Sequence, residues 1–437
     1  MTEVAERSKV LEGLNERFNS LNSDSEFHAV RRKALDYVNE KGLPHSKNEE
    51  YKFTNITRIL EKQFDISKKT KYSVEKSDVD ALIFEGLDAH RLVFINGEYS
   101  AELSDFEKVD GLNISTISEA IEKNDSEFLS LFGKTIQKNH DEFAALNTAI
   151  VEDGSFITVA DNTIIDKPIA LFFINDAATE KNYANSRNLI SIGKSSQVDF
   201  LEIFSTKGTN ESFTNIVTEI SVRENAIGNY YKIQNNNDNA SHIGTTQIHQ
   251  KRSSVFSTFT FTLNGGTVRN NLNIAVDGEG CESNMYGLYV VNGKTHVDNH
   301  TSADHIKPHS VSNELYKGIL EDNARGVFNG KVFVRQEAQK TNAFQSNKNI
   351  LLSDTAIVNT KPQLEIWADD VKCSHGCTTG QLDQDALFYL RARGLSKTSA
   401  RALLLYAFAI EVIESVKLEP LKNYLEHIIS ERLYKDF

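Results

Sequence analysis

Residues 254–266, SVFSTFTFTLNGG, decide the fold class of this 437-residue chain. Phe259, Phe261 and Leu263 alternate with threonines, so in an extended strand these three side chains lie on one face. Similar runs of β-branched and aromatic residues, separated by Gly, Asn, Asp and Ser, recur from about residue 154 to residue 368. LNIAVDGEG (272–280) and GKVFVRQEA (330–338) are examples. The pattern predicts a long region built mainly of β-strands.

The transitions from polar sequence to strand sequence recur at a steady interval. They fall at Ala226, Ser254, Cys281, Ser310 and Ala338, with separations of 28, 27, 29 and 28 residues. A steady period of this length indicates stacked structural repeats, and a parallel β-solenoid is the natural interpretation. An antiparallel β-sandwich is the alternative, but it needs several tight hairpins, and the sequence offers one clear candidate at residues 264–266.

Helical patterns flank this β-rich region on both sides. Apolar residues recur at helical spacing over residues 10–21, 27–38 and 117–132, and LVFINGEYS (92–100) predicts a strand around an Asn-Gly turn. After Gly380 we expect three helices, with Gly394 ending the first and Ser396 capping the second. The sequence therefore predicts an N-terminal α/β domain (1–153), a parallel β-helix core (154–378) and a C-terminal helical domain (379–437).

Composition excludes several classes of function. The chain has 48 Lys and Arg against 61 Asp and Glu, and this net charge of −13 disfavours a nucleic-acid partner. Runs of 18 apolar residues are absent, and the start MTEVAERSKV resembles neither a signal peptide nor a transit peptide. We therefore expect a cytoplasmic protein without a membrane partner. Three cysteines cannot build a disulfide framework.

Three features are weaker candidates for a functional site. Gly193-Lys194-Ser195 resembles part of a phosphate-binding loop, but strand sequence follows where that loop needs a helix. The thiol of Cys281 is expected to be a small buried group. Four histidines gather in residues 296–309 and are secondary candidates for a metal site, although a surface or turn role is preferred: His296, His300, His305 and His309.

The sharpest group of chemically capable residues is Cys373-Ser374-His375-Gly376-Cys377, at the boundary between the strand pattern and the C-terminal helices. An extended backbone places Cys373 and His375 on one side. Thiolate and imidazole together suit iron, zinc or persulfide sulfur. Two or three ligands underfill a four-coordinate site, so a metal here needs further donors from elsewhere.

These residues belong to a longer stretch, TKPQLEIWADDVKCSHGCTTGQLDQDALFYLRARGLS (360–396), which resembles the C-terminal signature of the SufB/SufD family of iron–sulfur cluster assembly scaffolds. Three other segments agree: residues 318–354, GEGCESNMYGLYV (278–290) and NEEYKFTNI (48–56). The resemblance covers most of the chain. The Lys-Cys-Ser-His-Gly pattern at 372–376 resembles the D-type branch, because the B-type branch has more cysteines and a glutamate-bearing sequence here.

The resemblance implies a right-handed parallel β-helix and a scaffold subunit that is not itself an enzyme. It implies pairing with SufB, docking of the ATPase SufC to the C-terminal helices, and a nascent cluster or iron held transiently and shared with SufB. His375, with Cys373 beside it, is the implied assembly residue at the SufB interface. Cys377 stands where the family usually has alanine and stays a secondary candidate. A flavin bound to the complex and a homodimer of the isolated chain are further expectations.

The middle C-terminal helix is apolar around most of its circumference between Leu403 and Ile413. The end of a solenoid cannot bury all of this surface, so we expect an exposed patch for SufC that includes Leu404 and Phe408. Two other functions remain open. The chain could be a β-solenoid enzyme of the exported kind that acts on polysaccharides, or a B-type-like scaffold that works as a homodimer.

Overall fold

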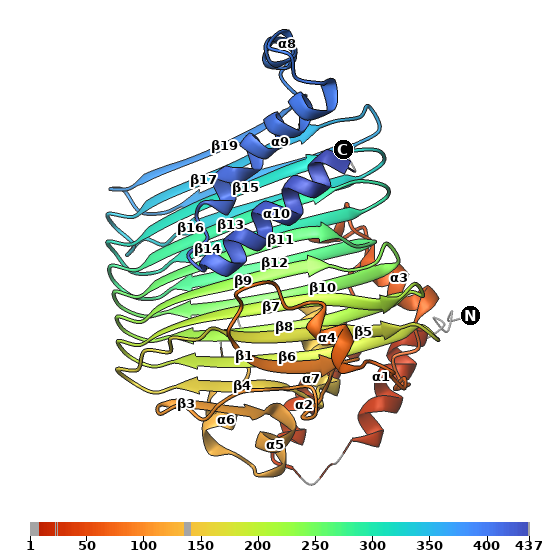
Figure 1. Cartoon of the computed structure of the whole chain (residues 1–437). Helices are drawn as coiled ribbons and strands as arrows, with labels where there is room; N and C mark the ends of the chain where they lie inside the picture. Colours follow the sequence, from red (N-terminus) through yellow and green to blue (C-terminus); the bar gives the residue numbers. More distant parts are fainter. Residues whose placement is uncertain (1–7, 22, 24, 135–140, 436–437) are drawn as a thin grey trace, which may run out of the picture.

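The computed structural model describes residues 8–21, 23, 25–134 and 141–435. Its centre is a pair of long sheets joined by short corners, with helices placed around them (Figure 1). The ten-stranded sheet contains β1 (His90–Ile95), β2 (Glu98–Tyr99), β5 (Ile169–Ala177), β7 (Gln197–Gly208), β9 (Ile227–Asn235), β11 (Val255–Asn264), β13 (Glu282–Val291), β15 (Val311–Leu320), β17 (Asn342–Leu351) and β19 (Lys372–Gly380). The nine-stranded sheet contains β3 (Leu112–Thr116), β4 (Gly154–Val159), β6 (Asn182–Ile192), β8 (Ser212–Val222), β10 (Ala240–Gln250), β12 (Thr267–Val276), β14 (His296–His305), β16 (Arg325–Val334) and β18 (Ile357–Ile366).

From β4 onward, successive strands alternate between the two sheets, and every neighbouring pair from β4 to β19 is parallel. Each turn of the chain thus lies on the previous one, as Figure 1 shows from yellow to blue. The predicted parallel β-solenoid is confirmed, and the β-sandwich alternative is wrong. The residues 264–266, offered as a hairpin, instead connect β11 to β12 in the opposite sheet.

Four of the repeat positions found in the sequence directly precede a strand of the ten-stranded sheet: Ala226, Ser254, Cys281 and Ser310 stand before β9, β11, β13 and β15. The fifth, Ala338, lies three residues before the equivalent position, which is Thr341 directly before β17. Ala226, Ser254, Cys281, Ser310 and Ala338 each have an exposed fraction of 1% or less. Small side chains are needed there because corresponding residues stack on each other; the Cys281 N–H, for instance, donates to Ser310 Oγ at 3.2 Å. Cys281 is therefore a packing residue, as its sequence context predicted.

The corners that lead into the strands of the ten-stranded sheet also stack. Five residues in them have positive φ: Ser195, Asn225, Ser253, His309 and Lys340. Their N–H groups bond to the next turn, since Ser253 donates to Glu279 O at 2.9 Å and Lys340 donates to Asp370 O at 2.7 Å. Gly193-Lys194-Ser195 forms one such corner between β6 and β7, without the helix that a phosphate-binding loop requires.

The N-terminal part contains α1 (Lys9–Ser20), α2 (His28–Lys41), η1 (Glu49–Tyr51), α3 (Ile56–Gln63), α4 (Lys76–Asp80), α5 (Ile117–Glu122), α6 (Ser126–Leu131) and α7 (Glu142–Ile150). The predicted Asn-Gly turn joins β1 to β2, with φ of 52° at Asn96 and 88° at Gly97. Residues 117–132 form two helices instead of one continuous pattern, because Asn124 takes a φ of 46° and Asp125 caps α6. The strands β1 and β3 extend the two solenoid sheets.

The C-terminal helices are α8 (Gln384–Ala392), α9 (Lys397–Ile413) and α10 (Glu419–Lys435). The Ser396 side chain caps α9 by accepting from Ser399 N, as predicted. Contrary to expectation, α9 lies along the outer face of the ten-stranded sheet, with Leu405 and Ala409 fully buried (Figure 1). The long side of the sheet, together with α10, covers far more apolar surface than the end of a solenoid could. None of the described helices has both the length and the apolarity needed to span a membrane.

Candidate functional site

The last turn of the solenoid is formed by β18 and β19. Each is the terminal strand of its sheet, so β18 pairs with β16 and β19 pairs with β17, and the opposite edge of each strand is uncovered. This uncovered last turn, residues 357–380, is called the open end below. In Figure 1 it is the blue upper edge of the sheets, beside α8 and α9. The Cys-Ser-His-Gly-Cys segment lies on it.

The strand register shows which way these side chains point. Cys373, His375 and Cys377 of β19 pair with Ala343, Gln345 and Asn347 of β17. The three β17 residues are buried inside the solenoid, with exposed fractions of 1%, 3% and 0%. Because in-register neighbours in a parallel sheet point the same way, all three β19 side chains face the interior. His375 and Cys377 are nevertheless exposed, since no further described turn covers them.

The two thiols of this group have different surroundings. Cys373 is half-buried beside an apolar cluster that includes Val332 and Ala343, and burial raises the pKa of its thiol. Cys377 is exposed, and its Sγ lies 2.7 Å from Thr360 Oγ1 on β18. The sequence drew attention to Cys373 and His375 as neighbours on one side. The participation of Thr360 depends on the fold and was missed, because Thr360 stands 17 positions before Cys377 in the sequence.

The open end thus presents an imidazole and two thiols toward one side. Among the described residues, no group of three or more His, Cys, Asp and Glu side chains is arranged to hold a metal ion. The arrangement can supply part of a ligand set for iron or bind sulfur, but a complete four-coordinate site needs donors from another molecule.

The four secondary histidine candidates are separated by the strand. His296 and His300 point from β14 to the outer face, where His296 Nε2 lies 2.8 Å from Thr54 Oγ1 and His300 lies between Asp298 and Glu50. His305 faces the interior, and burial lowers the pKa of its imidazole to about 4. His309 occupies a corner with a φ of 63°. The structure does not bring these four side chains together.

The NEEYKFTNI segment is bound to the outer face of the nine-stranded sheet. Arg269 Nη1 donates to Glu50 O at 2.7 Å, and the Arg269 guanidinium lies 3.9 Å from the Tyr51 ring centre. Thr54 donates to Asp298 Oδ2 at 2.5 Å, and Arg269 pairs with the same carboxylate at 2.7 Å. Burial alone would raise the pKa of Asp298, but His300 and Arg269 hold it well below its usual range. This part of the motif anchors the N-terminal region.

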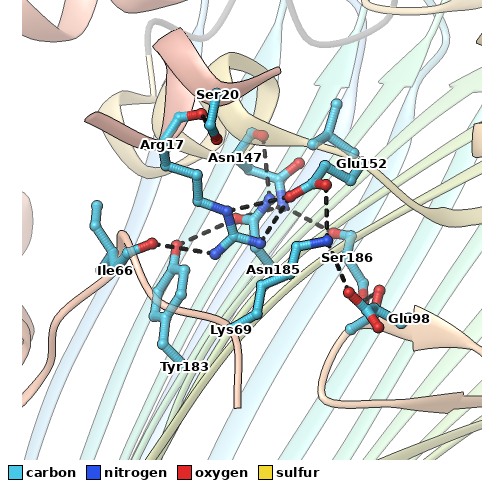
Figure 2. Close-up of polar contacts among 12 residues, drawn as sticks. Arg17, Ser20, Ile66, Lys69, Glu98, Asn147, Glu152, Tyr183, Asn185 and Ser186 are labelled. Atoms are coloured by element: carbon cyan, nitrogen blue, oxygen red, sulfur yellow. Dashed lines mark hydrogen bonds and ion pairs between the residues drawn. The ribbon is translucent and has the colours of Figure 1, made fainter. Parts of the chain in front are cut away.

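A second polar cluster lies near the first turns of the solenoid (Figure 2). Arg17 Nη2 pairs with Glu152 at 3.1 Å, and Lys69 bridges Glu152 and Glu98 at 2.8 and 2.7 Å. Asn147 donates to Ser186 O at 2.8 Å. Each of these charged groups has a partner of opposite sign within the chain. The cluster therefore joins α1 and the residue 69 segment to the solenoid.

The predicted docking residues of α9 are not its most exposed ones. Leu404 and Phe408 are partly buried and pack against the solenoid, and Lys317 Nζ lies 4.5 Å from the Phe408 ring centre. The exposed apolar side chains of the C-terminal helices are Phe388 (75%), Tyr389 (57%), Leu403 (47%) and Tyr434 (55%). The helix α8 carries two of these four, and Leu387 is its one buried residue.

Comparisons with known proteins identify the family of the chain. Residues 172–408 match the family model for the SufBD core domain of SUF system FeS cluster assembly, and residues 14–171 match the SufBD N-terminal region. An iron–sulfur cluster assembly SufBD family protein of Synechocystis is 32% identical over 434 residues, which cover 97% of this chain and 95% of that protein. The iron–sulfur cluster assembly protein SufD of Escherichia coli is 32% identical over 91% of each chain. SufD of Bacillus subtilis is 26% identical over 66% of each.

Proposed function

The chain belongs to the SufBD family of iron–sulfur cluster assembly proteins, and from this premise we propose that it is a D-type scaffold subunit. In this proposal it pairs with a SufB partner through the open end and contributes His375, with Cys373 beside it, to an assembly site shared by both chains. It acts as a scaffold and leaves ATP hydrolysis to a SufC partner bound by the C-terminal helices. Iron and sulfide are the cargo of the complex.

The observation that carries the proposal is the position of the Cys-His group on the uncovered last turn. Cys373 and His375 face the interior of the solenoid. In earlier turns the following turn covers such side chains, whereas β19 is the last strand of its sheet and has a free edge. A second chain placed there would cover these side chains and could add the missing donors. His375 is exposed, and its neutral imidazole can bind iron.

The C-terminal helices support the second part of the proposal. The helix α8 stands beyond the solenoid in Figure 1, and Phe388 and Tyr389 are exposed on it. Apolar and aromatic side chains exposed together are typical of protein interfaces. Because Leu404 and Phe408 are partly buried, they contribute to such an interface less than Phe388 and Leu403 do.

The test is genetic complementation of a strain that lacks this subunit, scored by the activity of a cluster-dependent enzyme. His375→Ala should leave the fold and the complex intact but lower that activity strongly, by about tenfold or more, since a lost metal ligand or its support costs 10- to 100-fold. His427→Ala is the matched control, because His427 is an exposed histidine on α10, away from the open end. Full activity with His375→Ala would contradict the assigned role.

Co-purification from native cells separates the remaining alternatives. A D-type subunit should bring down SufB and SufC partners, and iron and sulfide should be retained by the complex but not by the isolated chain. A B-type-like scaffold should retain a cluster as a homodimer without a second family member. A polysaccharide enzyme should act on acidic glycans and bind neither partner.

A further inference from the structure

The candidate assembly residue His375 continues a row of side chains that runs through the interior. Glu314 of β15, Gln345 of β17 and His375 of β19 occupy the same register position on three adjacent strands of the ten-stranded sheet. Glu314 and Gln345 are buried, with exposed fractions of 4% and 3%. Neighbouring strands lie about 4.8 Å apart, so each side chain of the row can contact the next.

The Gln345 amide is held in one orientation. Its Nε2 donates to Glu314 Oε2 at 2.7 Å. The amide also lies over Gly330 of the opposite sheet, where an added Cβ would stand 2.3 Å from Nε2, so a larger residue would displace it. Glu314 accepts this hydrogen bond in either protonation state, because an oxygen without a proton is always available.

The other end of the amide is an unused acceptor. Gln345 Oε1 is buried and has no hydrogen-bond partner among the residues that the structure describes. The oxygen of an amide diverges from its NH₂ group, so with Nε2 bonded to Glu314 of β15 the Oε1 is directed away from that carboxylate and is free to meet a side chain from β19, the other neighbour of β17. His375 is the in-register residue on that strand. A buried carbonyl without a hydrogen-bond partner is destabilising, so a donor at this place is favoured.

We propose that Gln345 is the positioning residue of His375. Its Oε1 accepts the hydrogen of one imidazole nitrogen, which fixes the tautomer and directs the lone pair of the other nitrogen toward the open end. Histidines that bind metals generally donate their second ring N–H in this way. This inference deepens the proposed function, since it rests on His375 as the residue that meets nascent cluster atoms.

The test measures the tautomer of His375 directly in the metal-free full chain. The protein is labelled with ¹⁵N-histidine, and the His375 signals are assigned by their loss in His375→Ala. At pH 8 the wild-type chain should show His375 in one tautomer, whereas the urea-unfolded chain gives the reference mixture. Gln345→Met keeps the length of the side chain and removes the acceptor, so His375 should shift to the reference mixture. Asn347→Leu is the matched control, because Asn347 shares the interior face of β17 but pairs with Cys377.

The inference holds if one tautomer dominates in the wild type and in Asn347→Leu and is lost in Gln345→Met. If His375 is a mixture of tautomers in the wild-type chain, the inference is wrong whatever the variants show. Retention of one tautomer in Gln345→Met, or equal loss in both variants, also overturns it. In complementation, Gln345→Met should lower activity about tenfold. If His375→Ala is fully active while the tautomer result holds, the proposed function fails and the positioning contact stands.

Discussion

Glu314 is an acidic side chain enclosed by the solenoid, and its titration should affect the stability of the fold. Burial raises the pKa of its carboxyl from 4.5 to about 7, and the nearby Thr301 hydroxyl and the hydrogen bond from Gln345 offset part of this rise. A folded-state pKa above the unfolded value means that the native state binds the proton more tightly. The corresponding stability is complete below pH 4.5 and is lost as pH rises through 7.

The variant Glu314→Gln removes this titration while keeping an oxygen for the Gln345 amide. Above pH 7 we expect it to be more stable than the wild type by up to about 3 kcal/mol, since each pKa unit corresponds to about 1.4 kcal/mol. The difference should shrink as pH falls and vanish near pH 4.5. Urea unfolding of both proteins from pH 4.5 to pH 8.5 measures it, and a gain that does not depend on pH would contradict the assignment.

At the level of single residues, spacing predicted orientation but not exposure. The interval of two between Cys373 and His375 placed them on one face, as the β19 register bears out. Their exposure depends on whether another turn of the solenoid follows β19, and the sequence around these residues does not predict this. In the same way, His305 ends β14 with its side chain inside the solenoid, whereas His309 lies in the corner that follows this strand, so their closeness in sequence did not predict a shared site.

At the level of elements, α8 offers the clearest surface for the proposed ATPase partner. Phe388→Asp on α8 and Leu403→Asp on α9 should each weaken co-purification with SufC by about tenfold or more, because a buried charge disrupts an apolar contact. Both side chains are exposed, so the isolated chain should unfold within about 0.5 kcal/mol of the wild type.

Leu405→Asp serves as the folding reference for these two variants. Leu405 is a fully buried residue of α9, so aspartate there should destabilise the helices themselves. Circular dichroism and thermal unfolding distinguish this loss of structure from a loss of docking. Normal SufC binding by folded Phe388→Asp and Leu403→Asp would remove α8 and the exposed side of α9 from the interface.

The ends of several helices and strands could be predicted from local sequence, whereas the packing of whole elements depends on tertiary contacts. The Ser396 cap and the Asn96-Gly97 turn are local features that the sequence displays openly. The place where α9 packs could not be predicted in this way, because its apolar residues contact the outer face of a sheet whose strands are far away in sequence. An all-round apolar helix was therefore assigned to a partner, although the chain itself covers most of it.

At the scale of the whole molecule, periodicity predicted the solenoid because every turn repeats the same contacts. The contributions of β1 and β3 to its sheets were not predicted, since they depend on pairing with β5 and β4 across long loops. The proposed domain limits at residues 153 and 378 stay predictions. A stack of turns also ends in strands whose outer backbone N–H and C=O groups are unpaired, and such edges can pair with a strand of another chain.

The two edge strands of the open end differ in their ability to accept another strand. Ile357 N–H bonds to Ala324 O of the preceding turn, so by alternation the even-numbered residues of β18 direct their N–H groups outward. Pro362 occupies one of these outward positions and has no N–H to offer. On β19, Lys372 N–H bonds inward to Thr341 O, so residues 373, 375, 377 and 379 direct their N–H groups outward. This strand is therefore the edge on which a partner strand can add.

Thr379→Pro tests whether pairing with SufB uses this edge. It removes an outward N–H and adds a ring at the edge, while the inward bonds of β19 to β17 persist. We expect pull-down of SufB to fall by about tenfold or more, equivalent to about 1.4 kcal/mol, with SufC still bound and the midpoint of thermal unfolding little changed. Thr378→Pro is the matched control, because its N–H points inward and its loss should loosen β19 and lower the unfolding midpoint. Sedimentation of the isolated chain shows whether self-association uses the same edge. Undiminished SufB binding by folded Thr379→Pro would place the interface elsewhere and leave the free edge of β19 without a partner strand.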